Sequence, residues 1–279
     1  MQWEGGIADE VPKRGGVDMK EFLKGDRPSI TALIYFGDIE KVKAETAAVI
    51  EQGADIIGYM LEGYEPECHT ESGMRELIEA AHGMPIYITD YANGNKYKED
   101  VTDEELKNQL MLFLELSKGK SPVLIDVRTD MYDRVKGEFT LSETAIRRQM
   151  DFIDEIHANG GKVLMSSHSF DSVSTPERVL YLAQEQQRRG ADIAKIVVTA
   201  PTEKDLFENY EISLRLKKEL NIPYLFLCGG DFSYRHRRLS APLGSCMTLV
   251  RENSFVNEVQ PTVAEAREIF KCLGYYDNK

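Results

Sequence analysis

The chain alternates short apolar runs with longer amphipathic segments, and this alternation constrains its fold more than any other feature. A short run of Val, Ile and Leu is typical of a strand that is covered on both faces, and parallel strands need a crossover segment between them. The pattern therefore predicts a parallel sheet of alternating strands and helices. The predicted strands are Ser29–Phe36, Asp55–Leu61, Pro85–Thr89, Pro122–Val127, Lys162–Ser167, Asp192–Val198, Pro223–Cys228 and Cys246–Val250.

The intervening segments place apolar residues three and four apart, which indicates helices. Thr102 precedes an acidic first turn, and Thr175 precedes a proline, as helix starts often do. Eight repeats favour a closed (β/α)8 TIM barrel over an open doubly wound sheet, and no GxGxxG motif follows the first strand. The clearest predicted helices are Ile39–Gln52, Thr102–Ser117, Leu141–Asn159, Thr175–Arg189 and Glu203–Leu220.

A barrel of this kind accounts for the whole length of 279 residues as one domain, 1–279. Residues 1–27 are expected to form an N-terminal cap or a short hairpin. The seventh strand is followed by an unusual connection, 229–238, rather than by a long helix.

Acidic residues outnumber basic ones by 47 to 34, for a formal net charge of −13. This balance argues against nucleic acid and anionic membrane surfaces as partners. The four cysteines are far apart and form no metal-site spacing, and the sequence has neither a signal peptide nor an apolar run long enough for a membrane span. We therefore expect a cytoplasmic protein that binds a small molecule and no metal.

Lys195 lies within a run that otherwise reads as a buried strand. Burial of an unpaired ammonium is costly, and burial favours the neutral amine, which can attack a carbonyl to form a Schiff base. The alternative is a structural lysine whose stem is buried and whose amine reaches water or a carboxylate.

Side chains two apart on a strand share a face, and the mouth of a barrel lies at the carboxyl ends of its strands. This counting pairs Ser166 with His168, places Lys195 with Ile193 and Val197, and groups Asp126 with Arg128. It also groups Gly58, Met60 and Glu62. His168 and Lys195 then come from adjacent strands, so a base lies beside an amine nucleophile.

The segments Met165-Ser-Ser-His168, Thr175-Pro-Glu177 and Gly190-Ala-Asp-Ile-Ala-Lys195 resemble type I 3-dehydroquinate dehydratases. The resemblance runs from about Arg27 to Phe270 and implies a class I aldolase-like barrel, a homodimer and cofactor-free chemistry. It implies that Lys195 forms an imine with the substrate ketone and that His168 is the general acid and base.

The same resemblance implies that Arg237 holds the substrate carboxylate and that Gln260 belongs to a lid loop. The alternative for Arg237 is that it decorates a solvated loop with its neighbours Arg235 and Arg238. The complete set of predicted substrate-binding residues is Arg237, Gln260, Arg128, Asp126, Glu62 and Tyr91.

The chain departs from the family pattern on the side of the expected pocket that binds the substrate hydroxyls. Gly58 and Met60 stand where the family has a glutamate and an arginine, and Tyr91 and Asn95 stand for an arginine and the glutamate that orients the histidine. Arg128 replaces a strand-four glutamate. The lid motif becomes Val256-Asn-Glu-Val-Gln260 and loses its serine.

We therefore expect a Schiff-base lyase that dehydrates 3-dehydroquinate or a related β-hydroxy keto acid. One alternative is an imine-forming lyase or aldolase with a different substrate. The other is a non-catalytic ligand-binding relative, because a base without an orienting partner loses efficiency. Asp126, Glu62 and Asp90 are the candidates for that missing partner.

Overall fold

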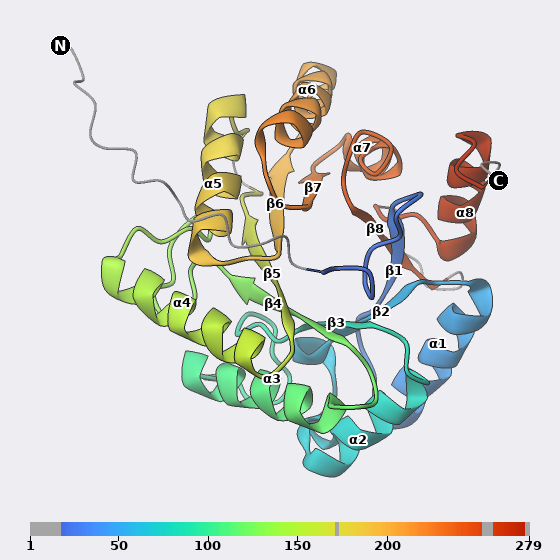
Figure 1. Cartoon of the computed structure of the whole chain (residues 1–279), viewed down its shortest axis with the longest axis vertical. Coiled ribbons are helices and arrows are strands. Elements are labelled where there is room, and N and C mark those ends of the chain that lie inside the picture. Colours follow the sequence, from blue (N-terminus) through green and yellow to red (C-terminus); the bar gives the residue numbers. More distant parts are fainter. Residues whose placement is uncertain (1–17, 171–172, 253–258, 277–279) are drawn as a thin grey trace.

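The structure, a computed structural model, describes residues 18–170, 173–252 and 259–276, and its centre is a single parallel sheet of eight strands. Each strand overlaps one of the predicted apolar runs, so the (β/α)8 barrel is confirmed. Figure 1 shows the strands at the centre with the helices around them. The strands are β1 Ser29–Ile34, β2 Ile56–Met60, β3 Ile86–Thr89, β4 Val123–Arg128, β5 Lys162–His168, β6 Ile193–Thr199, β7 Tyr224–Gly229 and β8 Met247–Arg251.

The sheet curls until its two ends almost meet. Strand order runs from β7 down to β1, and β1 also pairs with β8, with Ser29 opposite Met247. Between β7 and β8 the amide of Cys246 donates to the carbonyl of Tyr224 at 2.8 Å, and the amide of Phe226 donates to Ser245 Oγ at 3.1 Å. These bonds nearly close the barrel.

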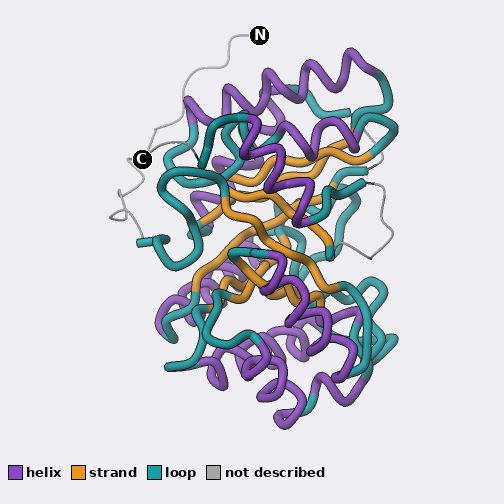
Figure 2. Tube along the Cα trace, turned by 90° about the vertical axis from the view of Figure 1, so that its right-hand side faces the viewer, coloured by secondary structure: helices purple, strands orange, loops and turns teal. Residues whose placement is uncertain are grey.

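Helices cover the outside of the barrel, and Figure 2 shows them on either side of the strands. All the predicted helices are present, with ends shifted by at most two residues, and the connection after β7 holds only a short helix. The helical segments are α1 Ile39–Gln52, η1 Leu61–Gly63, η2 Pro66–His69, α2 Glu71–Ala80, α3 Asp103–Ser117, α4 Glu143–Ala158, α5 Pro176–Arg189, α6 Glu203–Glu219, α7 Ser233–Leu239 and α8 Val263–Cys272.

Two helices outside the predicted set, α2 and α8, are short, with ten residues each. In α2 a glycine, Gly73, lies inside the helix, where it normally lowers helix stability. Packing explains this glycine, because a Cβ at Gly73 would lie 2.2 Å from the carbonyl oxygen of Glu67.

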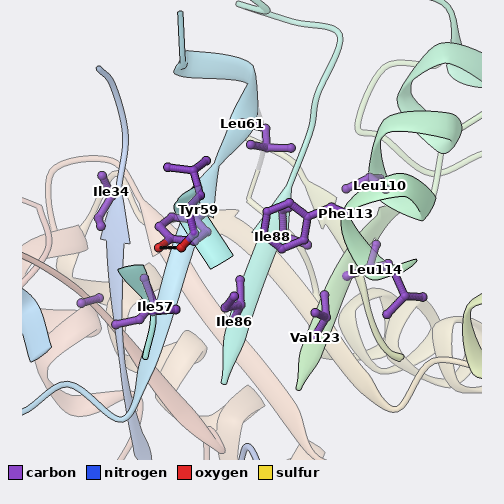
Figure 3. Close-up of a cluster of buried hydrophobic side chains, with 14 of the residues drawn as sticks. Ile34, Ile57, Tyr59, Leu61, Ile86, Ile88, Leu110, Phe113, Leu114 and Val123 are labelled. Carbon is purple, nitrogen blue, oxygen red and sulfur yellow. Dashed lines mark hydrogen bonds between the residues drawn. The ribbon is translucent and has the colours of Figure 1, made fainter. Parts of the chain in front are cut away.

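The hydrophobic core has an inner and an outer part. Leu33, Tyr87 and Ile193 belong to the cluster inside the barrel, which Met19 and Phe22 join from the described end of the N-terminal segment. The outer part lies between strands and helices, where Phe113 of α3 packs among side chains of β2 and β3 (Figure 3). Because side chains alternate along a strand, the inward position of Ile193 places Lys195 inside the barrel too.

Helix α3 begins with a reciprocal cap that we expect to contribute measurably to stability. Thr102 Oγ1 accepts from the amide of Glu105 at 3.2 Å, and a Glu105 carboxylate oxygen accepts from the amide of Thr102 at 2.8 Å. Thr102→Ala should lower the free energy of unfolding by about 1 kcal/mol, because the backbone amide of Glu105 loses its hydrogen-bond acceptor. Urea denaturation measures this change. Thr202→Ala, in the matching cap of α6, should behave alike, and an unchanged midpoint in both variants would contradict the argument.

Candidate active site

Lys195 lies inside the barrel with only 5% of its surface exposed. Its Nζ donates to Asp126 Oδ2 and to the Tyr87 hydroxyl, both at 2.9 Å, and lies 3.5 Å from the Tyr91 hydroxyl. The amine therefore does have a carboxylate partner, as the structural alternative required. However, Asp126 lies inside the barrel and not at its surface, so this carboxylate does not draw the amine out to solvent.

Asp126 is the centre of a buried polar layer. Its Oδ2 accepts from the Tyr87 hydroxyl and its Oδ1 from the Ser166 hydroxyl, each at 2.5 Å. Burial alone would raise the pKa of this carboxyl, but the charge of Lys195 and the two hydroxyl donors outweigh burial, and its pKa lies below the usual value. Asp126 thus holds Lys195 in place and is not an open substrate contact.

His168 ends β5, next to the strand that carries Lys195. In the ladder Ser166 is opposite Lys195 and His168 is opposite Val197. Burial lowers the pKa of His168 below its usual value, despite a hydrogen bond to Glu138 that acts in the opposite direction, so the imidazole is neutral at pH 7. The Tyr91 ring meets the imidazole edge-on, with centroids 6.1 Å apart.

The partner that orients His168 is Glu138, so the expectation of Asp126, Glu62 or Asp90 in this role was wrong. His168 Nδ1 lies 2.6 Å from Glu138 Oε2. An ionised carboxylate can only accept a hydrogen bond, so Nδ1 carries the proton and Nε2 is left as the base. Burial would raise the pKa of Glu138, but the hydrogen bond from His168 and the charge of Arg128 keep it below the usual value.

Glu138 comes from the loop between β4 and α4, where its backbone is held in an unusual conformation. Its φ of 51° lies in the left-handed region, and its carbonyl accepts a short hydrogen bond from the Thr129 hydroxyl. No local pattern marks such a residue. The one available clue is general, namely that loops after barrel strands supply site residues.

Arg128 was predicted to contact substrate, and in the structure its guanidinium forms ion pairs within the protein. Its guanidinium donates to both carboxylate oxygens of Asp130 at 2.9 Å and lies 3.2 Å from Glu138. It also stacks 5.5 Å above the Tyr91 ring. Arg128 therefore braces Glu138 and Tyr91, which in turn contact His168.

Glu62 and Asp90 are buried carboxyl groups near the mouth. Glu62 accepts from the Thr89 hydroxyl at 2.8 Å, and burial raises its pKa to about 7. Asp90 accepts from Asn95 at 2.8 Å, and burial raises its pKa well above the usual value. Glu62 therefore titrates near neutral pH.

Gly58 lies on β2 in close contact with β1. A Cβ at Gly58 would lie 2.4 Å from a methyl carbon of Leu33 and 3.2 Å from the carbonyl oxygen of Ala32. Leu33 thus fills the space that a longer side chain would need. This side of the barrel interior is therefore lined by hydrocarbon.

Arg237 and Gln260 both interact with the Tyr35 hydroxyl. Gln260 accepts a short hydrogen bond from the Tyr35 hydroxyl, and the charge of Arg237 acts on the same hydroxyl. Arg237 donates to the carbonyl of Cys228 at 3.1 Å. Sequence reasoning missed Tyr35, which follows β1 directly and carries no distinctive motif.

Among the described residues Arg237 has no acidic partner, unlike Arg235, which pairs with Glu203, and Arg238, which pairs with Glu265. The lack of a partner is costly for a half-buried guanidinium, whose pKa burial lowers. A planar guanidinium left open in this way can bind both oxygens of a carboxylate.

Within the described ranges, no group of three or more His, Cys, Asp or Glu side chains is placed to hold a metal ion. In the same part of the chain, no helix combines the length and the apolar character needed to cross a membrane.

Comparison with known proteins identifies the family of the chain. The family model described as type I 3-dehydroquinase matches residues 30–277. The 3-dehydroquinate dehydratase of Klebsiella pneumoniae is 23% identical over 240 residues, covering 85% of this chain and 89% of that protein. The enzyme of the same name from Methanosarcina acetivorans is 27% identical over 255 residues, covering 85% of this chain and 97% of that protein.

Solved structures show the same fold. The 3-dehydroquinate dehydratase from Geobacillus kaustophilus superposes with a TM-score of 0.77 at 20% identity, covering 92% of this chain and 95% of that one. The type I enzyme from Clostridium difficile gives a TM-score of 0.76 at 17% identity, covering 92% and 96%. With the family model matched over nearly the whole barrel, the chain belongs to the type I 3-dehydroquinate dehydratases, a family of hydro-lyases.

Proposed function

We propose that this chain is a Schiff-base hydro-lyase that dehydrates 3-dehydroquinate or a related β-hydroxy keto acid. The observation that carries the proposal is the pairing of Lys195, buried within the barrel, with a neutral His168 on the adjacent strand. The solved Clostridium difficile relative contains covalently modified comenic acid, which supports covalent chemistry in this fold.

The reaction begins when the Lys195 ammonium gives up a proton to solvent and becomes a neutral amine, held in place by Asp126 at 2.9 Å. The amine attacks the ketone carbon, and the resulting carbinolamine loses water to give a protonated imine. His168 Nε2 then removes a proton from the adjacent carbon, and the imine accepts the electron pair as an enamine. His168 returns the proton to the β-hydroxyl, which leaves as water. Hydrolysis of the imine releases the unsaturated ketone and restores Lys195.

Arg237 is the group proposed to hold the substrate carboxylate, with Tyr35 and Gln260 beside it. Its open guanidinium favours this role. Arg128, already bound to Asp130 and Glu138, serves the histidine instead.

A second candidate is an imine-forming lyase or aldolase whose substrate is not 3-dehydroquinate. Leu33 fills the space beside Gly58, and Tyr91 presents a ring where the family has an arginine. A site that leaves substrate hydroxyls unpartnered discriminates strongly against that substrate. The non-catalytic alternative loses its main argument, since Glu138 supplies the orienting carboxylate.

Borohydride trapping tests the imine. Incubation with 3-dehydroquinate and borohydride should add one reduced adduct to Lys195, which peptide mass spectrometry locates. Lys195→Ala should give no adduct, while Lys162→Ala, at the opposite end of β5, should still be labelled. If a panel of keto acids gives no adduct with the wild-type protein, the imine mechanism is wrong.

From the family relation we also propose a cytoplasmic homodimer. Sedimentation equilibrium measures the assembly, and a monomer at micromolar concentration would contradict it.

A further inference from the structure

A cleft of about 840 Å³ opens beside His168, on the side of the mouth away from Arg237. One wall is the loop after β4, with Arg134, Lys136 and Glu138, and the other is formed by Phe170 and the start of α5. The volume lies within the roughly 300–1,000 Å³ of pockets that enclose a small ligand. Because His168 lines the cleft, it is continuous with the proposed reaction centre.

Basic side chains dominate the charge of this cleft, although the chain as a whole carries −13. Among the described lining residues, the basic ones are Arg128, Arg134, Lys136 and Arg178, and the acidic ones are Asp130 and Glu138. Arg134 pairs with Asp103, and Arg128 with Asp130 and Glu138. The lining therefore has more positive than negative charge.

Arg178 stands out among these cations. No acidic partner for it is found in the described part of the chain, and aromatic rings hold it in place instead. Its guanidinium carbon lies 5.2 Å from the Phe139 ring centre and 5.5 Å from that of Tyr181. Stacking orients a guanidinium while leaving its N–H groups available to an anion.

The cleft also has an apolar surface that nothing in the described structure covers. Phe170 stacks on His168 with ring centres 5.7 Å apart and planes 19° apart, yet 58% of its surface is exposed. Val173, also in the lining, is 44% exposed. A flat ring beside the base and a cation farther out match a ligand with a planar or apolar linker and a terminal anion.

We propose that this cleft is a subsite for a second anionic group of the substrate, which favours a related β-hydroxy keto acid with two anions over 3-dehydroquinate with its single carboxylate. Arg237 holds the carboxylate on one side of Lys195, and Arg178 binds the second anion, a carboxylate or a phosphate, on the other. The assignment rests on the proposed function only in placing both anions on one substrate.

Titration with phenylphosphonate, a ring that carries a dianion, tests the subsite without any chemistry at Lys195. Ligand-observed NMR should detect binding, and Arg178→Gln should weaken it about tenfold, since one charge-assisted contact is lost. Phe170→Ala should weaken it too. Arg188→Gln is the matched control, because Arg188 lies on the same helix but outside the cleft, paired with Glu185.

Equal affinity in the wild-type and Arg178→Gln proteins would overturn the proposal, as would absence of binding. Loss of binding in Arg237→Gln but not in Arg178→Gln would place the probe at the other anion site and also overturn it. Borohydride trapping separates this result from the proposed function, because failed trapping removes the imine and leaves phenylphosphonate binding untouched.

Discussion

Replacing Glu138 with glutamine is expected to lower kcat about 10²- to 10⁴-fold, the range that a correctly held general acid and base contributes. Glu138 accepts a hydrogen bond from the protonated Nδ1 of His168 at 2.6 Å, and this leaves Nε2 as the base. A glutamine can present its amide to Nδ1 instead and stabilise the wrong tautomer. KM should change less than kcat, because Glu138 acts on the proton-transfer steps through the histidine.

The pH profile distinguishes this positioning role from a structural one. Glu138 raises the pKa of His168, so its loss should shift the acid limb of kcat/KM to lower pH. Lys195 should still be trapped by borohydride in the variant, and Glu138→Asp should recover part of the rate. Glu143→Gln, on the first turn of α4, is the control. A wild-type kcat in Glu138→Gln would show that the histidine needs no orienting carboxylate.

Replacing Asp126 with asparagine is expected to lower the free energy of unfolding by about 3–5 kcal/mol, since it leaves a buried ammonium without its counterion. Lys195 would keep its contacts with the hydroxyl groups of Tyr87 and Tyr91. Urea denaturation at pH 7 measures the loss. The double variant Asp126→Asn, Lys195→Met should recover much of it, because the unpaired charge is gone.

The same ion pair should govern part of the acid sensitivity of the fold. The pKa of Asp126 is lower in the folded protein than its usual value of 3.8, so its stabilising contribution is complete above that pH. The contribution is lost as the pH falls through the folded value. Asp126→Asn should therefore flatten the stability curve below about pH 4. A single variant as stable as wild type, with the same acid dependence, would show that the pair contributes nothing.

The sequence predicted the strands, the helices and the side-chain positions that follow from their periodicity. Alternation along strands placed Lys195 inside the barrel and His168 on the neighbouring strand, because that spacing is fixed by the backbone. The sequence could not identify Glu138. This residue reaches the histidine from a loop in which its own backbone is left-handed and its carbonyl accepts a hydrogen bond from Thr129. Nor could the sequence foresee that the Arg128 guanidinium would pair with Asp130, two residues away.

The surroundings of Gly58 and Tyr91 could be explained only from three-dimensional contacts. The sequence shows a glycine at position 58, but only packing shows that Leu33 occupies the space in front of it. Tyr91 likewise reads as a simple replacement for an arginine. In the structure its hydroxyl reaches both Lys195 and Ser166, and its ring contacts His168.

The polar layer of Tyr87, Asp126, Ser166 and Lys195 has a consequence for how this protein can evolve. Most barrels fill such a layer with branched hydrocarbon, and well-packed apolar replacements of a buried ion pair often leave a protein as stable or more so. Selection for catalysis and selection for thermal stability therefore pull these four positions in opposite directions. A lineage released from the need for turnover should lose this layer first and gain heat resistance as it does.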